Sequence, residues 1–143
     1  MDSNPPGNVR KPVAGRRVRS ARLAEILAAI ENQSHDPALS AMTLAQKLGV
    51  TSRYVHLLMQ DTGRSFAAHV LLKRLETAAT MLRDPSFQMR KISEIAQLAG
   101  FTDVSYFSRA FRHRYGTTPT ELRDRAMREA RHAGSRDLPG PAA

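Results

Sequence analysis

The sequence predicts an all-α fold of seven helices. Apolar side chains recur at helical spacing through most of the chain, and alternating strand patterns are almost absent. Prolines, glycines and capping residues divide this stretch into segments of helix length. One motif also occurs twice, at an offset of 51 residues, which predicts two similar helical units. A length of 143 residues suits one domain with short extensions.

The composition favours a polyanionic partner. The chain has 22 Lys and Arg residues against 13 Asp and Glu residues, and the resulting net charge of +9 attracts nucleic acid or anionic lipid. The absence of cysteine excludes disulfides and thiolate zinc sites. No apolar run reaches the roughly 20 residues that span a bilayer. We therefore expect no membrane partner and a cytoplasmic, nucleoid-associated protein.

Capping residues and breakers set the predicted boundaries. Residues 1–19 are rich in proline, glycine and arginine and are predicted to form a flexible basic arm, and residues 132–143 a disordered tail. The domain between them covers residues 20–131, and its first helix follows Ser20 and ends before Ser34. The later segments are a helix-turn-helix over about 40–62, a linker helix over about 65–83, a second helix-turn-helix over about 91–115 and a final helix over about 119–130.

The repeated motif has the layout of a helix-turn-helix. The matched segments are Leu44-Ala45-Gln46 with Ile95-Ala96-Gln97, Gly49-Val50-Thr51 with Gly100-Phe101-Thr102, and, after one inserted residue, Tyr54-Val55 with Tyr106-Phe107. In each copy an alanine lets two helices cross closely, a glycine supplies the turn and an apolar residue fills the angle. Any helical hairpin has some of these features. Two matched copies in a basic chain favour a pair of helix-turn-helix units instead. Their recognition helices would then lie about one duplex turn (~34 Å) apart.

These residues resemble a known family. Residues 95–112 (IAQLAGFTDVSYFSRAFR), followed by Tyr115-Gly116-Thr117-Thr118-Pro119, are similar to the second helix-turn-helix signature of AraC/XylS-type transcription regulators. Residues 49–54 and the linker residues Arg74, Leu75 and Ala78 agree with the first half, so the resemblance covers about residues 20–128. It implies double-stranded DNA binding and regulation of transcription, more often activation than repression, with RNA polymerase as a candidate partner.

Four residues differ from those usual in the family. Met59 replaces a core phenylalanine, His69 a common tyrosine and Leu122 a common aromatic residue. Leu57 stands on the first recognition helix where a polar or basic side chain is usual. A leucine there either reads a thymine methyl group or makes no base contact.

Candidate base contacts follow from helical spacing and from the family positions. The residues expected to face base edges are Arg53, His56, Leu57, Ser105, Ser108 and Arg109. Arg109 suits a bidentate contact to guanine O6 and N7, and the alternative is a contact to phosphate or solvent. Arg53 contacts either a base or a phosphate. His56 either donates to DNA or is an idle surface histidine.

Candidate phosphate contacts surround these positions. They are Ser52, Tyr54, Arg64, Tyr106, Arg112 and Arg114. The alternative for each residue is a solvated basic face, and for the two tyrosines it is packing between helices. The basic arm either follows a minor groove or is inert.

No enzyme site is expected. The five histidines, at positions 35, 56, 69, 113 and 132, lack metal-ligand spacing, and the chain has no Gly-rich phosphate loop and no GxSxG elbow. We therefore expect no catalytic residue, no metal and no cofactor.

The leading interpretation is sequence-specific duplex binding that regulates transcription. One alternative is a non-specific basic nucleic-acid-binding protein, and the other is a helical interaction module, which Leu57 keeps open. The sequence has no dimer seam, so we expect a monomer on an asymmetric site. The residues before Ser20 are too few for a sensing domain, and the chain is either a stand-alone regulator or a fragment of a longer one.

Overall fold

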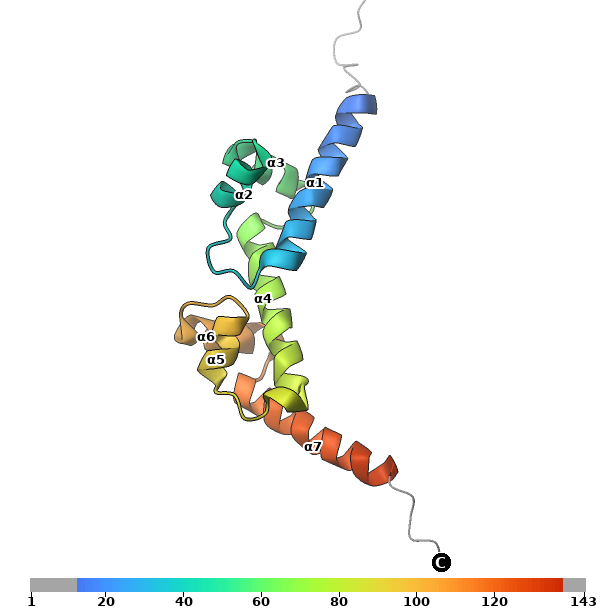
Figure 1. Ribbon diagram of the computed structural model, residues 1–143, viewed down its shortest axis with the longest axis vertical. Coiled ribbons are helices and arrows are strands. Elements are labelled where there is room, and N and C mark those ends of the chain that lie inside the picture. Colours follow the sequence, from blue (N-terminus) through green and yellow to red (C-terminus); the bar gives the residue numbers. More distant parts are fainter. Residues whose placement is uncertain (1–12, 138–143) are drawn as a thin grey trace, which may run out of the picture.

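The computed structural model describes residues 13–137, and helices are the only regular secondary structure in that part. The helices are α1 (Val13–Gln33), α2 (Ala41–Leu48), α3 (Ser52–Gln60), α4 (Phe66–Arg83), α5 (Ile92–Leu98), α6 (Val104–Tyr115) and α7 (Pro119–Asp137), with a short 3-10 helix, η1 (Pro85–Phe87), after α4. The predicted all-α fold, its seven helices and its long linker helix are confirmed within these residues. Figure 1 shows α4 in the middle, with α2 and α3 beside one half and α5 and α6 beside the other half, on the same side.

Helix α4 contributes to two separate hydrophobic cores. Its first half supplies Phe66 and Val70 to a core built with side chains from α1, α2 and α3. Its second half supplies Leu75 and Leu82 to a core built with α5, α6 and α7. The repeated motif therefore gives two units with their own interiors, and α4 is the element that both units share.

Capping residues fix the starts of α2 and α3. The backbone N–H of Thr43 donates to the Ser40 hydroxyl at 3.1 Å, and that of Tyr54 donates to the Thr51 hydroxyl at 3.0 Å. Each bond satisfies one N–H group that a helix leaves unpaired in its first turn. Gly49 ends α2 with a φ of 69°, a left-handed conformation that glycine adopts without steric cost.

Two helix boundaries differ from the prediction. Helix α1 begins at Val13, so residues 13–19, predicted as part of the arm, are helical, and residues 1–12 of the arm lie outside the described residues. The sequence after Pro12 contains alanine and arginine, which favour helix, and proline suits the start of a helix. Helix α7 continues to Asp137 because no proline interrupts the chain between Pro119 and Pro139. The rest of the predicted tail lies outside the described residues.

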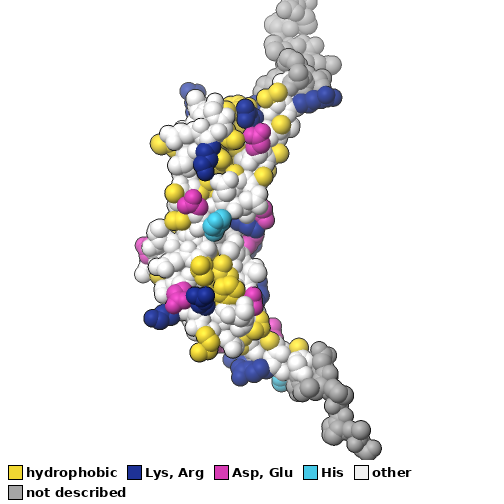
Figure 2. All heavy atoms as spheres, in the orientation of Figure 1, with side chains coloured by type: hydrophobic (Ala, Val, Ile, Leu, Met, Phe, Trp, Pro, Cys, Tyr) yellow, Lys and Arg dark blue, Asp and Glu magenta, His cyan; other side chains and the backbone are white. Residues whose placement is uncertain are grey.

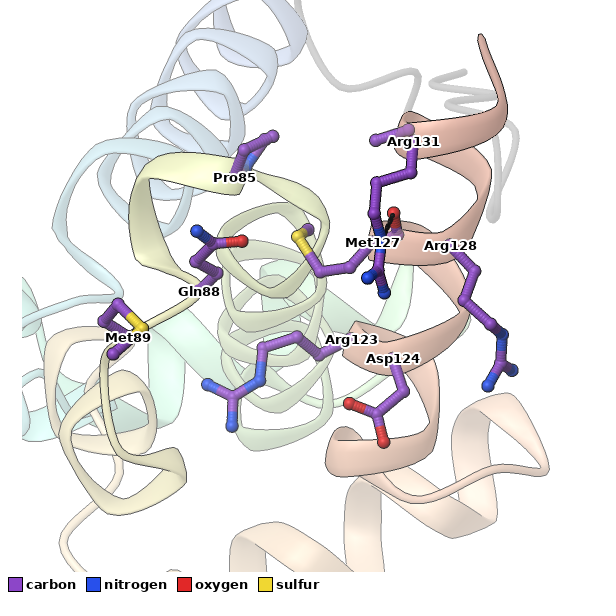
Figure 3. A pocket seen from close by; sticks show the side chains of 9 residues that line it. Pro85, Gln88, Met89, Arg123, Asp124, Met127, Arg128 and Arg131 are labelled. Carbon is purple, nitrogen blue, oxygen red and sulfur yellow. Dashed lines mark hydrogen bonds between the residues drawn. The ribbon is translucent and has the colours of Figure 1, made fainter. Parts of the chain in front are cut away.

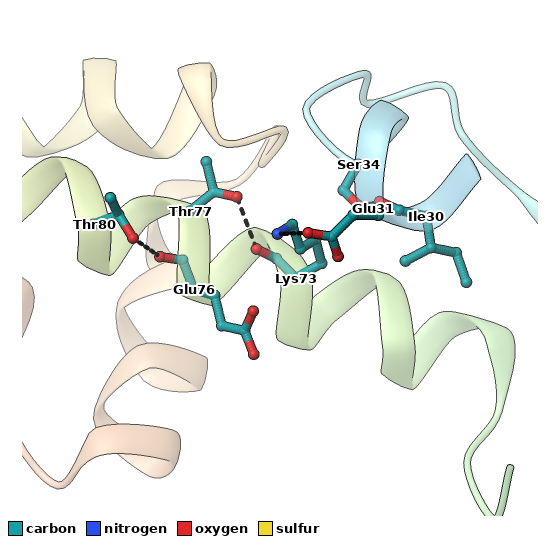
Figure 4. A network of polar contacts seen from close by, with 7 residues as sticks. All are labelled: Ile30, Glu31, Ser34, Lys73, Glu76, Thr77 and Thr80. Atoms are coloured by element: carbon teal, nitrogen blue, oxygen red, sulfur yellow. Dashed lines mark hydrogen bonds and ion pairs between the residues drawn. The ribbon is translucent and has the colours of Figure 1, made fainter. Parts of the chain in front are cut away.

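Figure 4 shows an ion pair between the end of α1 and the middle of α4, and hydrogen bonds within α4 beside it. The Lys73 ammonium lies 2.6 Å from a carboxylate oxygen of Glu31. The hydroxyl groups of Thr77 and Thr80 donate to the carbonyl groups of Lys73 and Glu76, one turn earlier in α4. Glu31 is exposed, so we expect the ion pair to add little stability by itself.

We expect Phe107→Ala to lower the free energy of unfolding by about 3–5 kcal/mol, because the ring is fully buried and its removal leaves a cavity. The ring also lies 4.9 Å from Phe101 and 5.6 Å from Phe111, measured between centroids. Urea unfolding followed by circular dichroism measures the change. Met89→Ala is the control, since Met89 is 89% exposed and its loss should stay within about 0.5 kcal/mol. Equal effects of the two substitutions would contradict this core.

Glu121 makes the start of α7 sensitive to pH. Its carboxylate accepts hydrogen bonds from the Thr117 hydroxyl at 2.7 Å and the Thr118 N–H at 3.2 Å, and these bonds lower the pKa of Glu121. A lowered pKa gives stability that is present above the pKa of the unfolded chain and is lost as the pH falls through the folded pKa.

We therefore expect Glu121→Gln to unfold at lower urea than the unmodified protein at neutral pH. The difference should shrink as the pH falls below the pKa of the Glu121 carboxyl group. Midpoints measured over a pH series test this expectation, with Glu129→Gln as the control on the same helix. If the difference between the urea midpoints of Glu121→Gln and the unmodified protein does not change with pH, the charge of the Glu121 carboxylate does not contribute to stability.

Candidate nucleic-acid interface

One face of α3 is open to solvent while the other closes the first core. Val55, Leu58 and Met59 are buried. The exposed side chains lie along the opposite face at helical spacing, and they are Arg53, His56, Leu57 and Gln60. The structure thus brings together the three residues predicted to face bases on this helix. Leu57 is 44% exposed and is not part of the core.

Helix α6 repeats this arrangement in the second unit. Phe107 and Phe111 are buried, and the exposed face carries Ser105, Tyr106, Arg109, Arg112 and His113. Arg109 makes no hydrogen bond or ion pair within the described part of the chain. Its guanidinium group is therefore available to a partner. Ser108, also predicted to face a base, is half-buried at the edge of this face.

The predicted phosphate contacts do not all share the surface of the recognition helices. Arg64 is exposed in the turn after α3, and Ser52 is half-buried at the start of that helix. Tyr54 packs against the first core, which is the alternative noted for it. Arg114 lies over the Tyr115 ring at 5.4 Å, roughly 140° around α6 from Arg109 on ideal helix geometry. Arg114 therefore points away from the exposed face of α6.

Two residues on these faces were not singled out from the sequence. Gln60 follows Leu57 at a spacing of three residues, and His113 follows Arg109 at a spacing of four. Both side chains are exposed and carry groups able to donate to base edges or phosphates. Helical spacing could have identified both residues, because each lies one turn beyond the last predicted base contact on its helix.

Arg74 joins the linker helix to both units. Its Nε donates to the Ser34 carbonyl at 2.8 Å and its Nη2 to the Asp36 carbonyl at 2.9 Å, in the segment between α1 and α2. Burial lowers the pKa of the Arg74 guanidinium, against the opposing effect of the Asp36 carboxylate. Gly100, in the turn before α6, lies so close that an added Cβ atom would overlap the Ser34 carbonyl oxygen.

Charge is spread along the molecule. In the view of Figure 2, basic side chains lie over both units with acidic ones between them, and they do not gather into one patch. The residues described contain no group of three metal-binding side chains. None of the described helices is long and apolar enough to cross a membrane.

A hollow of about 850 Å³ lies between α7 and the segment after α4 (Figure 3). Arg123 reaches across from α7 and donates to the Arg90 carbonyl. Met127 and Gln88 face each other from the two sides. No residue of α3 or α6 lines this hollow, so it is separate from the exposed faces of the recognition helices.

Comparison with known proteins identifies the family. A helix-turn-helix domain family matches residues 44–125, which is more than half of the chain. The transcriptional activator RhrA of Rhizobium meliloti is 32% identical over 111 residues, covering 78% of this chain and 35% of that protein. The chain belongs to the AraC/XylS family. Its members are transcription regulators, which are not enzymes, and AraC-type domains bind DNA.

Further relatives agree with the AraC-type assignment. The transcriptional activator NphR of a Rhodococcus species is 32% identical over 101 residues, which cover 71% of this chain and 29% of NphR. The chain therefore spans about a third of the length of the curated relatives it matches. The C-terminal domain of the response regulator yesN from Fusobacterium nucleatum is 31% identical with a TM-score of 0.64, covering 73% of this chain and 98% of that one.

The AraC-type domain should be sensitive to bulk at Gly100. We expect Gly100→Ala to lower the free energy of unfolding by more than about 3 kcal/mol, because strain at a φ of 108° adds to the overlap with Ser34 and Arg74. Gly116→Ala is the matched control: its φ is 72° and no atom lies within 4 Å of the added Cβ, so the loss should be about 1–2 kcal/mol. Urea unfolding measures both, and equal losses would contradict the close contact.

Proposed function

We propose that this chain binds double-stranded DNA sequence-specifically, with α3 and α6 in successive major grooves, and thereby regulates transcription. The observation that carries the proposal is that α3 and α6, each with a face of exposed side chains, lie on the same side of α4 (Figure 1). Helix α4 has 18 residues, and a helix of this length is about 27 Å long. Units at its two ends suit recognition sites separated by about one duplex turn, ~34 Å.

The two faces offer different chemistry to DNA. Arg109 and Ser105 on α6 suit a guanine contact and a hydrogen bond to a base edge. His56 and Gln60 on α3 supply donors, and Leu57 supplies an apolar contact to a thymine methyl group. Two unlike faces favour an asymmetric site bound by one molecule.

We propose activation as the direction of regulation, and the names of two relatives support it. Both are named transcriptional activators, and RNA polymerase is the partner that an activator would contact. A DNA-bound regulator of this kind acts in the cytoplasm, associated with the nucleoid. The alternatives, a non-specific nucleic-acid-binding protein and a helical interaction module, predict different results in the experiment below.

Selection from a random duplex pool tests specificity and supplies the operator. The selected duplex should bind roughly 10³-fold or more tightly than random duplex. Equal displacement by random duplex would favour non-specific binding, and no binding to any duplex would favour the interaction module.

Arg109→Ala should then cost about 1–3 kcal/mol on the selected duplex and relax the preference at one base pair. The control is Arg128→Ala, which removes the same charge from an exposed residue of α7. Fluorescence anisotropy with operator variants measures both proteins. If Arg109→Ala and Arg128→Ala lose equal affinity on every duplex, Arg109 does not read a base.

A further inference from the structure

A hollow of about 390 Å³ lies between the two helix-turn-helix units. Its lining combines residues from both units with residues of α4. The apolar part includes Leu39, Phe66, Val70, Leu71 and Phe101. The polar part consists of Ser40, which precedes α2, and of His56, Arg74 and Tyr106 from α3, α4 and α6. Mostly apolar hollows of about 300–1,000 Å³ with a few polar groups are typical of small-molecule sites.

Arg74 supplies a positive charge to this hollow. Its Nε and Nη2 donate to backbone carbonyls, whereas Nη1 makes no hydrogen bond within the described residues. No carboxylate of the described residues forms an ion pair with it. The Asp36 carboxylate acts on this half-buried guanidinium without forming an ion pair, so Nη1 can still donate to an anion, and a carboxylate matches its hydrogen-bonding geometry.

The aromatic side chains indicate the body of the ligand. Phe66, Phe101 and Tyr106 contribute three rings to the lining, and rings prefer to pack edge-to-face or offset against one another. The volume is near the lower end of the range for small-molecule sites, which suits one or two rings. We propose that the hollow binds a small aromatic carboxylate, with its rings among the apolar side chains and its carboxylate at Arg74.

Binding there has a consequence for regulation, which rests on the proposed function. His56 and Tyr106 belong both to the hollow and to the exposed faces of α3 and α6. A ligand held beside them occupies space that a bound duplex needs and neutralises positive charge near its phosphates. The ligand therefore weakens DNA binding.

The first test uses the full chain without DNA. The probe is 2-naphthoate, and the matched control is 2-naphthamide, which has the same rings and no charge. Methyl NMR spectra should show saturable shifts at Leu39, Val70 and Leu71 with 2-naphthoate, and 2-naphthamide should bind at least about tenfold more weakly. Equal binding of the two compounds, or no saturable shift at millimolar concentration, would overturn the proposal.

A variant that fills the hollow locates the site. Ala67 is exposed on α4 and lines the hollow, so Ala67→Phe places a ring where the ligand would lie. We expect this variant to bind 2-naphthoate at least about tenfold more weakly. Ala24→Phe, on an exposed residue of α1 outside the hollow, should bind like the unmodified protein. Unchanged binding by Ala67→Phe would overturn the location. If Ala67→Phe does not fold, the comparison of 2-naphthoate with 2-naphthamide on the unmodified protein still tests the proposal.

The last measurement separates the hollow from the proposed function. Adding 2-naphthoate to the complex with the selected duplex should weaken DNA binding, and 2-naphthamide should leave it unchanged. Naphthoate binding by a chain that selects no duplex would overturn the proposed function and keep the ligand site. Naphthoate binding without any change in duplex affinity would overturn the competition.

Discussion

The contact of Arg74 with the segment between α1 and α2 is the constraint on which the rest of the structure depends. Each helix-turn-helix unit has its own core, so core packing alone does not set the angle between the units. Arg74 donates to the carbonyls of Ser34 and Asp36. Gly100 of the second unit packs closely beside the same Ser34 carbonyl. The two units therefore meet at the Arg74 side chain of the helix that they share.

The two units share a backbone plan and differ in what they present. Helix α3 exposes a leucine and a histidine, and α6 exposes an arginine among small and polar side chains. The buried residues follow the repeat, since the same crossing of helices needs apolar side chains at the same places. The exposed residues are free of that requirement. The buried positions of the two units are therefore alike, whereas their exposed positions carry different side chains.

Much of the fold could be predicted because its signals are local. Ser40 and Thr51 cap the starts of α2 and α3 and Gly49 ends α2, and each of these roles involves only neighbouring residues. The outer ends of α1 and α7 were predicted too short, because no local breaker marks them. Arg114 was grouped with the contact residues on charge, whereas helical spacing turns it away from Arg109. The contacts of Arg74 join segments about 40 residues apart, and no local pattern indicates them.

Because α4 contributes to both cores, the stabilities of the two units are coupled. Melting either core leaves half of this helix without its packing partners, and a helix of nine residues is marginal in water by itself. A destabilising substitution in one unit therefore also destabilises the other unit, although the other unit does not contact the substituted residue. The duplicated halves form a single cooperative molecule, and neither half is an independent module that recombination could separate intact.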